Sequence, residues 1–330
     1  MLGKRHKYMQ IGLVKIQNLT RLAPMADVSD IPFRMVSREC GSDLVTSEEI
    51  DAKALCLGSE RTKAMARYLP QEHPIALQLL GDDPDHLAEA ARRLEGEGAD
   101  IIDLNMGCPT PKVTSKGQGA ALMKDPEKAA KIFQAMRRAI KVPLTIKIRG
   151  GWDEQHVNAV EIARIAHAQG VDAVTVHPRT RSQHFTGTAP WEIIRQVAQA
   201  IGIPVTGNGD VRSWADARRM VTETGVESVM IGRAAMGQPW IFDKNFDELS
   251  AGARLDYRRR VIWRHRELIL EHLPSRIAFI RLKKNLVWYM SGLPHAASIR
   301  QKIFMAKDSE TAWAVFQEHW PEQALCLAPA

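Results

Sequence analysis

Short apolar runs alternate with amphipathic stretches through the first 250 residues, and two recurring patterns mark where the runs begin. In the first, a glycine, a small residue and an acidic or polar residue precede the run, as at Gly41, Gly98, Gly170 and Gly225. In the second, a proline precedes the run, as at Pro74, Pro143 and Pro204. Such runs are typical of buried strands. Together with residues 22–25 they predict eight β-strands.

Stretches of helical period lie between these runs, at residues 84–97, 126–140, 158–169 and 213–222. Nearly continuous apolar strands that alternate with helices indicate a parallel sheet buried on both faces. Eight such units favour a closed (β/α)8 TIM barrel. The competing fold, an open dinucleotide-binding sheet, requires G-x-G-x-x-G after its first strand, and the sequence that follows Leu22 does not contain it.

Residues 251–330 show helical periodicity without strand-like runs, which predicts a small C-terminal helical bundle. We therefore expect a barrel domain at 1–250 and a helical domain at 251–330. Net charge separates the same two parts. The chain carries +7, and residues 251–330 hold 13 Lys and Arg against seven Asp and Glu. The excess positive charge belongs to the helical part and points to an anionic partner.

No apolar run reaches the ~18–20 residues that a membrane-spanning helix needs, and the basic residues 1–7 precede no apolar segment. We expect a cytoplasmic monomer without membrane association. The cysteines lack CxxC spacing and a neighbouring histidine cluster, so neither a disulfide nor a metal site is expected. Cys40, Cys56 and Cys326 are interpreted as small hydrophobic residues of the structure.

Chemistry in a (β/α)8 barrel takes place at the carboxyl ends of the strands. The residues that end the predicted strands are Met25, Glu48, Gln78, Asn105, Lys147, His177, Asn208 and Gly232 with Arg233. The glycine-rich segments 207–210 and 232–233 follow the seventh and eighth strands, where barrels commonly bind phosphate through loop amides. Arg233 can add positive charge there.

Cys108 follows the fourth strand and opens a polar, glycine-rich loop, which is an unusual place for a cysteine of the core. A thiol with an ordinary pKa of ~8.5 can serve as a general acid at neutral pH, whereas a nearby cation would turn it into a nucleophile. The sequence leaves both roles open.

At these segments the chain resembles the tRNA-dihydrouridine synthases, and among them the bacterial B-type subgroup. The matching segments include Ala-Pro-Met-Ala at 23–26, Asn-Met-Gly-Cys-Pro at 105–109, His-Pro-Arg-Thr-Arg at 177–181, Gly-Asn-Gly-Asp at 207–210 and Gly-Arg-Ala-Ala at 232–235. Two positions of the barrel part depart from the family pattern, and the tail segment 283–289 resembles the family's Arg-Lys-His…Trp-Tyr segment with two further substitutions. Asp27 and Pro178 stand where the family usually has glycine.

The resemblance implies an FMN enzyme that reduces the C5–C6 double bond of uridines in tRNA, with NADPH as reductant. It implies that Cys108 donates the proton to C5. It assigns flavin contacts to Pro24, Met25, Ala26, Gln78, Lys147 and His177, and phosphate contacts to Asn208, Gly209, Asp210, Gly232 and Arg233. Asn105 and Arg149 would contact the uracil, and Lys283 and Lys284 the tRNA.

Two other functions stay open from the sequence. One is an FMN-dependent barrel enzyme that acts on a free pyrimidine such as dihydroorotate. The other is an RNA-binding protein without catalysis. A basic ridge on the helical part is consistent with RNA, because Arg281 and Lys284 are three residues apart and share a helix face. Chemistry on a tRNA base also requires the base to leave its stack.

Overall fold

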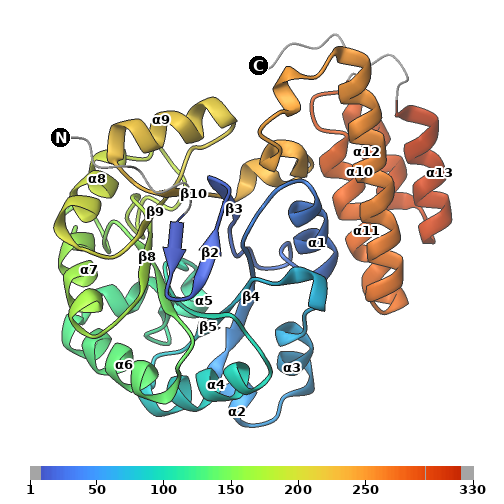
Figure 1. The fold of residues 1–330 in the computed structure, drawn as a ribbon. Coiled ribbons are helices and arrows are strands. Elements are labelled where there is room, and N and C mark those ends of the chain that lie inside the picture. The colour runs from blue at the N-terminus through green and yellow to red at the C-terminus, as the bar shows by residue number, and fades with distance from the viewer. Residues whose placement is uncertain (1–8, 294, 321–330) are drawn as a thin grey trace. The chain divides into compact units, whose positions relative to one another are not determined.

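The computed structural model describes residues 9–293 and 295–320. Eight parallel strands form one sheet in the order β3-β10-β9-β8-β7-β6-β5-β4. They are β3 (Thr20–Leu22), β4 (Val45–Asp51), β5 (Ile75–Leu80), β6 (Ile101–Met106), β7 (Leu144–Arg149), β8 (Ala173–His177), β9 (Val205–Asn208) and β10 (Ser228–Ile231). The Leu22 N–H donates to the Leu44 carbonyl at 3.3 Å, which joins β3 to the segment that leads into β4. The predicted (β/α)8 barrel is confirmed (Figure 1).

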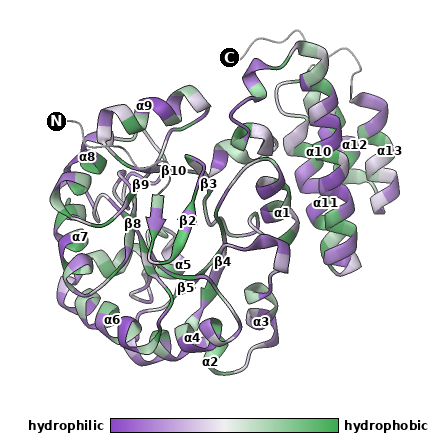
Figure 2. Ribbon diagram, in the orientation of Figure 1, coloured by the Kyte–Doolittle hydropathy of each residue, from purple (hydrophilic) through white to green (hydrophobic). Residues whose placement is uncertain are grey.

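Helices surround this sheet (Figure 1). Most of them begin at a residue whose side chain caps the helix. The large ones are α4 (Pro84–Gly96), α6 (Pro126–Ala139), α7 (Ala159–Ala168), α8 (Trp191–Ala200) and α9 (Trp214–Thr224). Asp83 caps α4 and Asp125 caps α6, each just before a proline at the first helical position. Hydrophilic and hydrophobic residues mix along these helices, as one buried face requires (Figure 2).

Short elements complete the barrel unit. They are α2 (Ala52–Cys56), α3 (Glu60–Ala66), α5 (Pro111–Thr114), and the 3-10 helices η1 (Pro70–Glu72) and η2 (Gly119–Lys124). An N-terminal hairpin of β1 (Met9–Ile11) and β2 (Val14–Ile16) packs against residues at the starts of the barrel strands, including Leu44, Ile101 and Ala173. The sequence did not predict this hairpin, because three-residue strands are too short to show a period. The first barrel strand ends at Leu22, so Met25 lies in the following loop.

A second compact unit comprises residues 31–41 and 233–330. It contains α1 (Ile31–Glu39), α10 (Ala251–His272), α11 (Ser275–Tyr289), α12 (Ala296–Met305), α13 (Ser309–His319), and the 3-10 helices η3 (Arg233–Ala235), η4 (Pro239–Phe242) and η5 (Phe246–Glu248). The expected division at residue 250 differs from this one, because Trp240 and Phe246 belong to the core of the helical unit. The rings of Trp240 and Tyr289 stack there at 6.0 Å.

Three further findings concern the expectations about cysteines, membranes and metals. Cys40 is buried and Cys56 half-buried, and Cys326 lies outside the described residues, as do the basic residues 1–7. Within the described chain, no helix is both long and apolar enough to cross a membrane. The same residues contain no group of three or more His, Cys, Asp or Glu side chains arranged to hold a metal ion.

Candidate active site

The register of the parallel strands brings the predicted polar residues together at one mouth of the barrel. Gln78 lies opposite Asp103, and Asn105 lies opposite Lys147. Arg149 is paired with His177 on the next strand. Side chains at matching positions on neighbouring parallel strands point to the same side. The strand-end residues from β5 to β8 therefore form one cluster.

On β4, the acidic residue at the barrel mouth is not the one that the sequence predicted. A register shift between Thr46 and Glu49 places Glu49, rather than Glu48, opposite Gln78. Such a bulge inserts a residue and redirects the side chains that follow it. The strand also continues to Asp51, so that Glu48 does not end it. Glu49 is the acidic side chain that joins the cluster.

Asn105 is the centre of a hydrogen-bond network at the mouth. Its Nδ2 donates to Gln78 Oε1 at 2.9 Å and to Glu49 Oε2 at 3.1 Å. Its Oδ1 accepts the N–H groups of Gly107 at 3.0 Å and Cys108 at 2.9 Å. Both ends of the amide are thus used within the protein, and they fix the start of the Cys108 loop relative to two strands.

The network continues into the barrel interior. Gln78 Nε2 donates to Asp103 Oδ2 at 2.7 Å, and Thr145 Oγ1 donates to Asp103 Oδ1 at 2.5 Å. Burial raises the pKa of Asp103 despite these hydrogen bonds. Arg21 donates through Nη2 to the hydroxyls of Thr175 and Thr206, and burial lowers its pKa to about 10. A polar interior of this kind holds the side chains at the mouth in fixed orientations.

Cys108 is half-buried, with Sγ 3.3 Å from Thr110 Oγ1. Burial raises the pKa of the thiol, and the negative charge of Glu49 raises it further. The Glu49 carboxyl is also in hydrogen-bonding contact with the thiol, and burial raises the pKa of Glu49 as well. These surroundings favour the protonated thiol over the thiolate.

Lys147 is half-buried beside this cluster. Burial and the neighbouring Arg149 guanidinium lower its pKa to about 8, against the attraction of Asp103. Among the described residues, no hydrogen bond or ion pair involves the Lys147 ammonium. A desolvated ammonium group whose N–H donors have no partner in the protein can bind an anionic group of a ligand.

The loop after β9 is shaped by glycine. Gly209 has φ +120°, and a Cβ there would lie 2.9 Å from His177 Cδ2 and 3.1 Å from Ala189 Cβ. Only glycine combines that backbone conformation with so close an approach. The buried His177 ring is therefore held against the backbone at Gly209. Beside it, Asn208 Nδ2 donates to the Met230 carbonyl at 2.8 Å, which links the ends of β9 and β10.

The predicted residues from the first and last strands lie in loops. Pro24 and Met25 are half-buried and Ala26 is exposed. The Met25 N–H donates to Ser29 Oγ at 2.9 Å, and Gly232 has Met25 Sδ 3.5 Å from where its Cβ would stand. Arg233 follows directly in the chain and is exposed.

Asp27, the first departure from the family pattern, has φ +60°, a conformation in which glycine is the least strained residue. Asp is tolerated in this region better than most side chains. At the second departure, the Pro178 carbonyl lies 2.1 Å from where a Cβ of Gly150 would stand. The neighbouring Gly150 N–H donates to the Arg179 carbonyl at 3.1 Å. The backbone at position 178 thus lies so close to Gly150 that position 150 has no room for a side chain.

With this geometry in place, comparison with known proteins is informative. Residues 21–325 match the family model described as dihydrouridine synthase (Dus). The chain belongs to the dihydrouridine synthase family. It is 40% identical to tRNA-dihydrouridine synthase B of Xanthomonas campestris over 94% of this chain and 96% of that protein. It is 37% identical to tRNA-dihydrouridine synthase B of Pseudomonas aeruginosa (95% and 96%) and to a probable tRNA-dihydrouridine synthase of Rickettsia prowazekii (91% and 93%).

Membership of the dihydrouridine synthase family confirms the resemblance found in the sequence, and the structure adds residues that the sequence did not single out. Asp103 and Glu49 are two, and Arg179 is a third. Arg179 is 2% exposed and donates to both carboxylate oxygens of Asp210, at 3.0 and 2.7 Å. The Asp210 carboxylate is thereby directed toward Arg179. Asp103 and Asn105 are two residues apart on β6, so their side chains point to the same side of the sheet. This spacing could have identified Asp103 from the sequence.

The Arg149 guanidinium binds loops of the protein itself. Its Nε donates to the Gly107 carbonyl at 2.8 Å, and its Nη1 to the carbonyls of Thr180 at 3.0 Å and His184 at 2.7 Å. Phe185 lies with its ring centroid 5.5 Å from the guanidinium. Arg149 therefore ties the Cys108 loop to the loop after β8.

The two predicted tRNA contacts of the helical unit lie on α11. Lys283 Nζ donates to the Phe304 carbonyl at 3.3 Å and lies 4.0 Å from the centre of the Phe279 ring. Lys284 Nζ lies 5.1 Å from the centre of the Trp288 ring. Both side chains are half-buried along their length. Lysines of this kind bury their alkyl stems and keep the charge near the surface.

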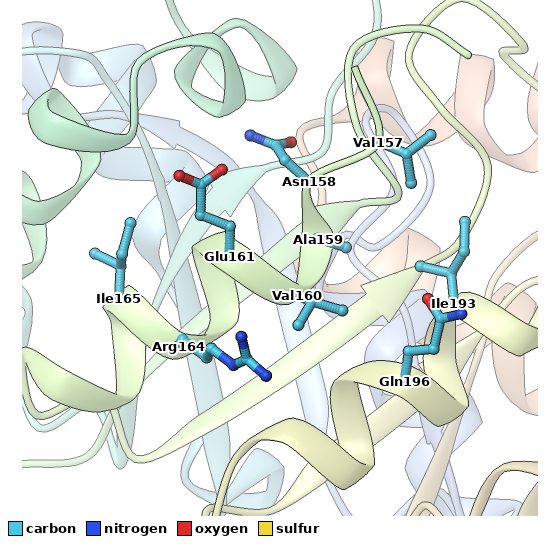
Figure 3. A pocket seen from close by; sticks show the side chains of 9 residues that line it. All are labelled: Val157, Asn158, Ala159, Val160, Glu161, Arg164, Ile165, Ile193 and Gln196. Atoms are coloured by element: carbon cyan, nitrogen blue, oxygen red, sulfur yellow. The ribbon is translucent and has the colours of Figure 1, made fainter. Parts of the chain in front are cut away.

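A cavity of about 490 Å³ lies on the outside of the barrel at helices α7 and α8 (Figure 3). Its lining includes Glu161, Arg164, Ile193 and Gln196, which extend from the outer helices. It contains none of the predicted site residues. The strand-end cluster is therefore the candidate site, and the outer cavity is separate from it.

Proposed function

We propose that this chain reduces the C5–C6 double bond of uridines in tRNA, with FMN as bound cofactor and NADPH as reductant. The observation that carries the proposal is the Cys108 thiol, which is kept protonated at the barrel mouth by burial and by Glu49. A protonated thiol fits a general acid. Family membership and the names of the relatives supply the reaction, since these are tRNA-dihydrouridine synthases.

The residues at the mouth fit a flavin mononucleotide. Lys147 offers a desolvated cation that would hold the N1–O2 edge of the ring, and His177 would lie against the flavin. Gly209 and Gly232 have no side chains that would cover the amides of their loops, as a phosphate cradle requires. Asn208, the Asp210 backbone and Arg233 would complete it, while Pro24, Met25, Ala26 and Gln78 would bind the ring. The Asp210 carboxylate is paired with Arg179, and this pairing would offset its repulsion of the phosphate.

When bound, the reduced flavin supplies a hydride to C6 of the uracil. Cys108 gives its thiol proton to C5. Asn105 orients the Cys108 loop through the N–H groups of Gly107 and Cys108. Arg149 holds the same loop from the other side through the Gly107 carbonyl. Contacts of Asn105 and Arg149 with the uracil would have to use the remaining lone pairs and N–H groups of these side chains.

The helical unit is proposed to bind the tRNA through phosphate contacts of Lys283 and Lys284. Its basic charge supports this role, because charge neutralisation supplies most of the affinity for nucleic acid. Phosphate contacts orient the RNA and do not read its sequence. The target uridine would leave its stack to enter the barrel mouth. The proposed setting is a cytoplasmic monomer.

The test is incubation of the purified protein with FMN, NADPH and unmodified tRNA, followed by mass-spectrometric mapping of dihydrouridine. We expect a flavin absorption spectrum and a mass increase at specific uridines. Free uracil and dihydroorotate are offered in parallel. Turnover on these small molecules, without reaction on tRNA, would instead support the free-pyrimidine enzyme. Binding of tRNA without flavin or NADPH oxidation would support an RNA-binding protein.

A further inference from the structure

Glu49 is a half-buried carboxyl group that the sequence did not single out and the family resemblance did not assign. The bulge in β4 turns it into the barrel mouth opposite Gln78. Asn105 Nδ2 donates to its Oε2 at 3.1 Å, while the other end of the same amide accepts the Cys108 N–H at 2.9 Å. One amide thus holds both the carboxyl and the backbone that carries the thiol.

We propose that Glu49 is the proton relay for Cys108: it holds the thiol protonated and returns a proton to the sulfur after each reduction. This rests on the proposed function, in which Cys108 is the acid. Asn105 acts as a positioning residue, because it fixes Glu49 and Cys108 relative to each other. A relay requires two exchangeable groups held close together, and Asn105 binds the Glu49 carboxyl at 3.1 Å and the Cys108 N–H at 2.9 Å.

The proton balance of the relay is simple. Cys108 Sγ–H gives its proton to C5 of the uracil and becomes a thiolate, while the two electrons arrive with the hydride at C6. The carboxylic acid form of Glu49 then gives its proton to Sγ and becomes a carboxylate. That step runs downhill, because a carboxylic acid is a stronger acid than a thiol. The carboxylate finally takes up a proton from solvent.

The surroundings favour the protonated carboxyl that the relay needs. Burial raises the pKa of Glu49, and the charges of Glu48 and Asp51 on the same strand raise it further, while its contact with Cys108 lowers it. From β5 and β6 it faces the neutral amides of Gln78 and Asn105. The cations of the cluster, Lys147 and Arg149, stand on β7, where Arg149 lowers the pKa of Lys147 and the Cys108 thiolate would raise it.

The first test measures Cys108 reactivity on the protein alone, without flavin or tRNA. Iodoacetamide alkylation of the Cys108 peptide is followed by mass spectrometry from pH 6 to 10 in wild type, Glu49→Gln and Glu48→Gln. Removal of the Glu49 charge should lower the alkylation midpoint by about one pH unit. Alkylation at pH 8.5 should then be several-fold faster in E49Q. E48Q makes the same charge change on the same strand and should leave Cys108 within about twofold of wild type.

The second test follows turnover on tRNA against pH. E49Q should lose about tenfold in turnover at pH 7, and its activity should decline at a lower pH than that of wild type. Alkylation and turnover of E49Q equal to those of E48Q would overturn the proposal. So would a wild-type Cys108 that alkylates with a midpoint below pH 8, a measurement that does not depend on the folding of any variant. If wild type showed no activity on tRNA, the proposed function would be wrong. The alkylation data would still test the effect of Glu49 on Cys108, because they do not depend on activity.

Discussion

The Arg179 guanidinium and the Asp210 carboxylate form a two-pronged ion pair, with N–O distances of 3.0 and 2.7 Å, beside the loop proposed to bind the flavin phosphate. Asp210 Oδ2 also accepts the Ala189 N–H at 2.7 Å. Arg179 further donates to the Thr186 carbonyl at 3.0 Å. This pair joins the loops after β8 and β9 and directs the carboxylate toward Arg179.

Asp210→Asn tests the pair. The variant leaves the Arg179 charge buried without its counter-charge, and we expect the free energy of unfolding to fall by about 3 kcal/mol. Urea denaturation measures this. Glu192→Gln, which removes a carboxylate from the exposed pair with Arg195, serves as control and should leave the midpoint unchanged. Equal effects of the two substitutions would contradict the structural role of Asp210.

Lys147→Met tests the desolvated cation. The folded protein holds Lys147 at a pKa of about 8, below the ~10.4 of an unfolded lysine, so its charge costs stability at neutral pH. The cost fades between pH 8 and 10, because the unfolded state then binds more protons than the folded state. We expect K147M without flavin to be about 1–3 kcal/mol more stable than wild type at pH 7, with a smaller difference at pH 10. Urea denaturation at both pH values measures the difference in unfolding free energy between K147M and wild type. A difference that grew with pH would contradict the prediction.

The same variant should bind FMN about tenfold more weakly, since a charge-assisted hydrogen bond is lost. Flavin fluorescence titration gives the dissociation constant. Wild-type affinity should decrease as pH rises past the pKa of Lys147, and K147M should lack that decrease. An unchanged FMN affinity would remove Lys147 from the flavin site.

Gly209→Ala tests the approach of the loop to His177. The new Cβ would stand 2.9 Å from His177 Cδ2 on a backbone at φ +120°. We expect a loss of about 2–4 kcal/mol of stability and weaker FMN binding. The control is Gly96→Ala at the end of α4, where nothing lies within 4 Å; it should be neutral or slightly stabilising. Calorimetric melting of the two variants provides the comparison, and a neutral G209A would show that the loop can move.

Lys284→Glu tests the helical unit as an RNA surface. We expect tRNA affinity to fall about tenfold. The slope of log affinity against log salt concentration should become shallower by the amount that corresponds to about one phosphate contact. Lys131→Glu makes the same charge change on the exposed side of α6 and is the control. Filter binding at several salt concentrations measures both. Equal losses in the two variants would point to net charge rather than to a local contact.

The barrel and most of the residues at its mouth could be predicted from the sequence. Each strand repeats the same pattern, an apolar run followed by polar residues near its carboxyl end. His177 ends its strand, and Gln78, Asn105 and Lys147 lie within two residues of the carboxyl ends of theirs. Glu49 could not be distinguished from Glu48, since a bulge shifts the strand by one residue without a signature in the sequence. The pair of Arg179 and Asp210 joins residues 31 positions apart, which only the folded loops bring together.

The central claim is that Cys108 is the acid in a reduction of uridine in tRNA. Wild type, Cys108→Ala and Cys56→Ala, each with FMN and NADPH, are incubated with unmodified tRNA, and dihydrouridine is mapped by mass spectrometry. We predict that C108A binds flavin and tRNA as wild type does but forms at least about a hundredfold less dihydrouridine. C56A, which lacks a thiol at the end of α2, should retain activity. Full dihydrouridine formation by C108A would contradict the account.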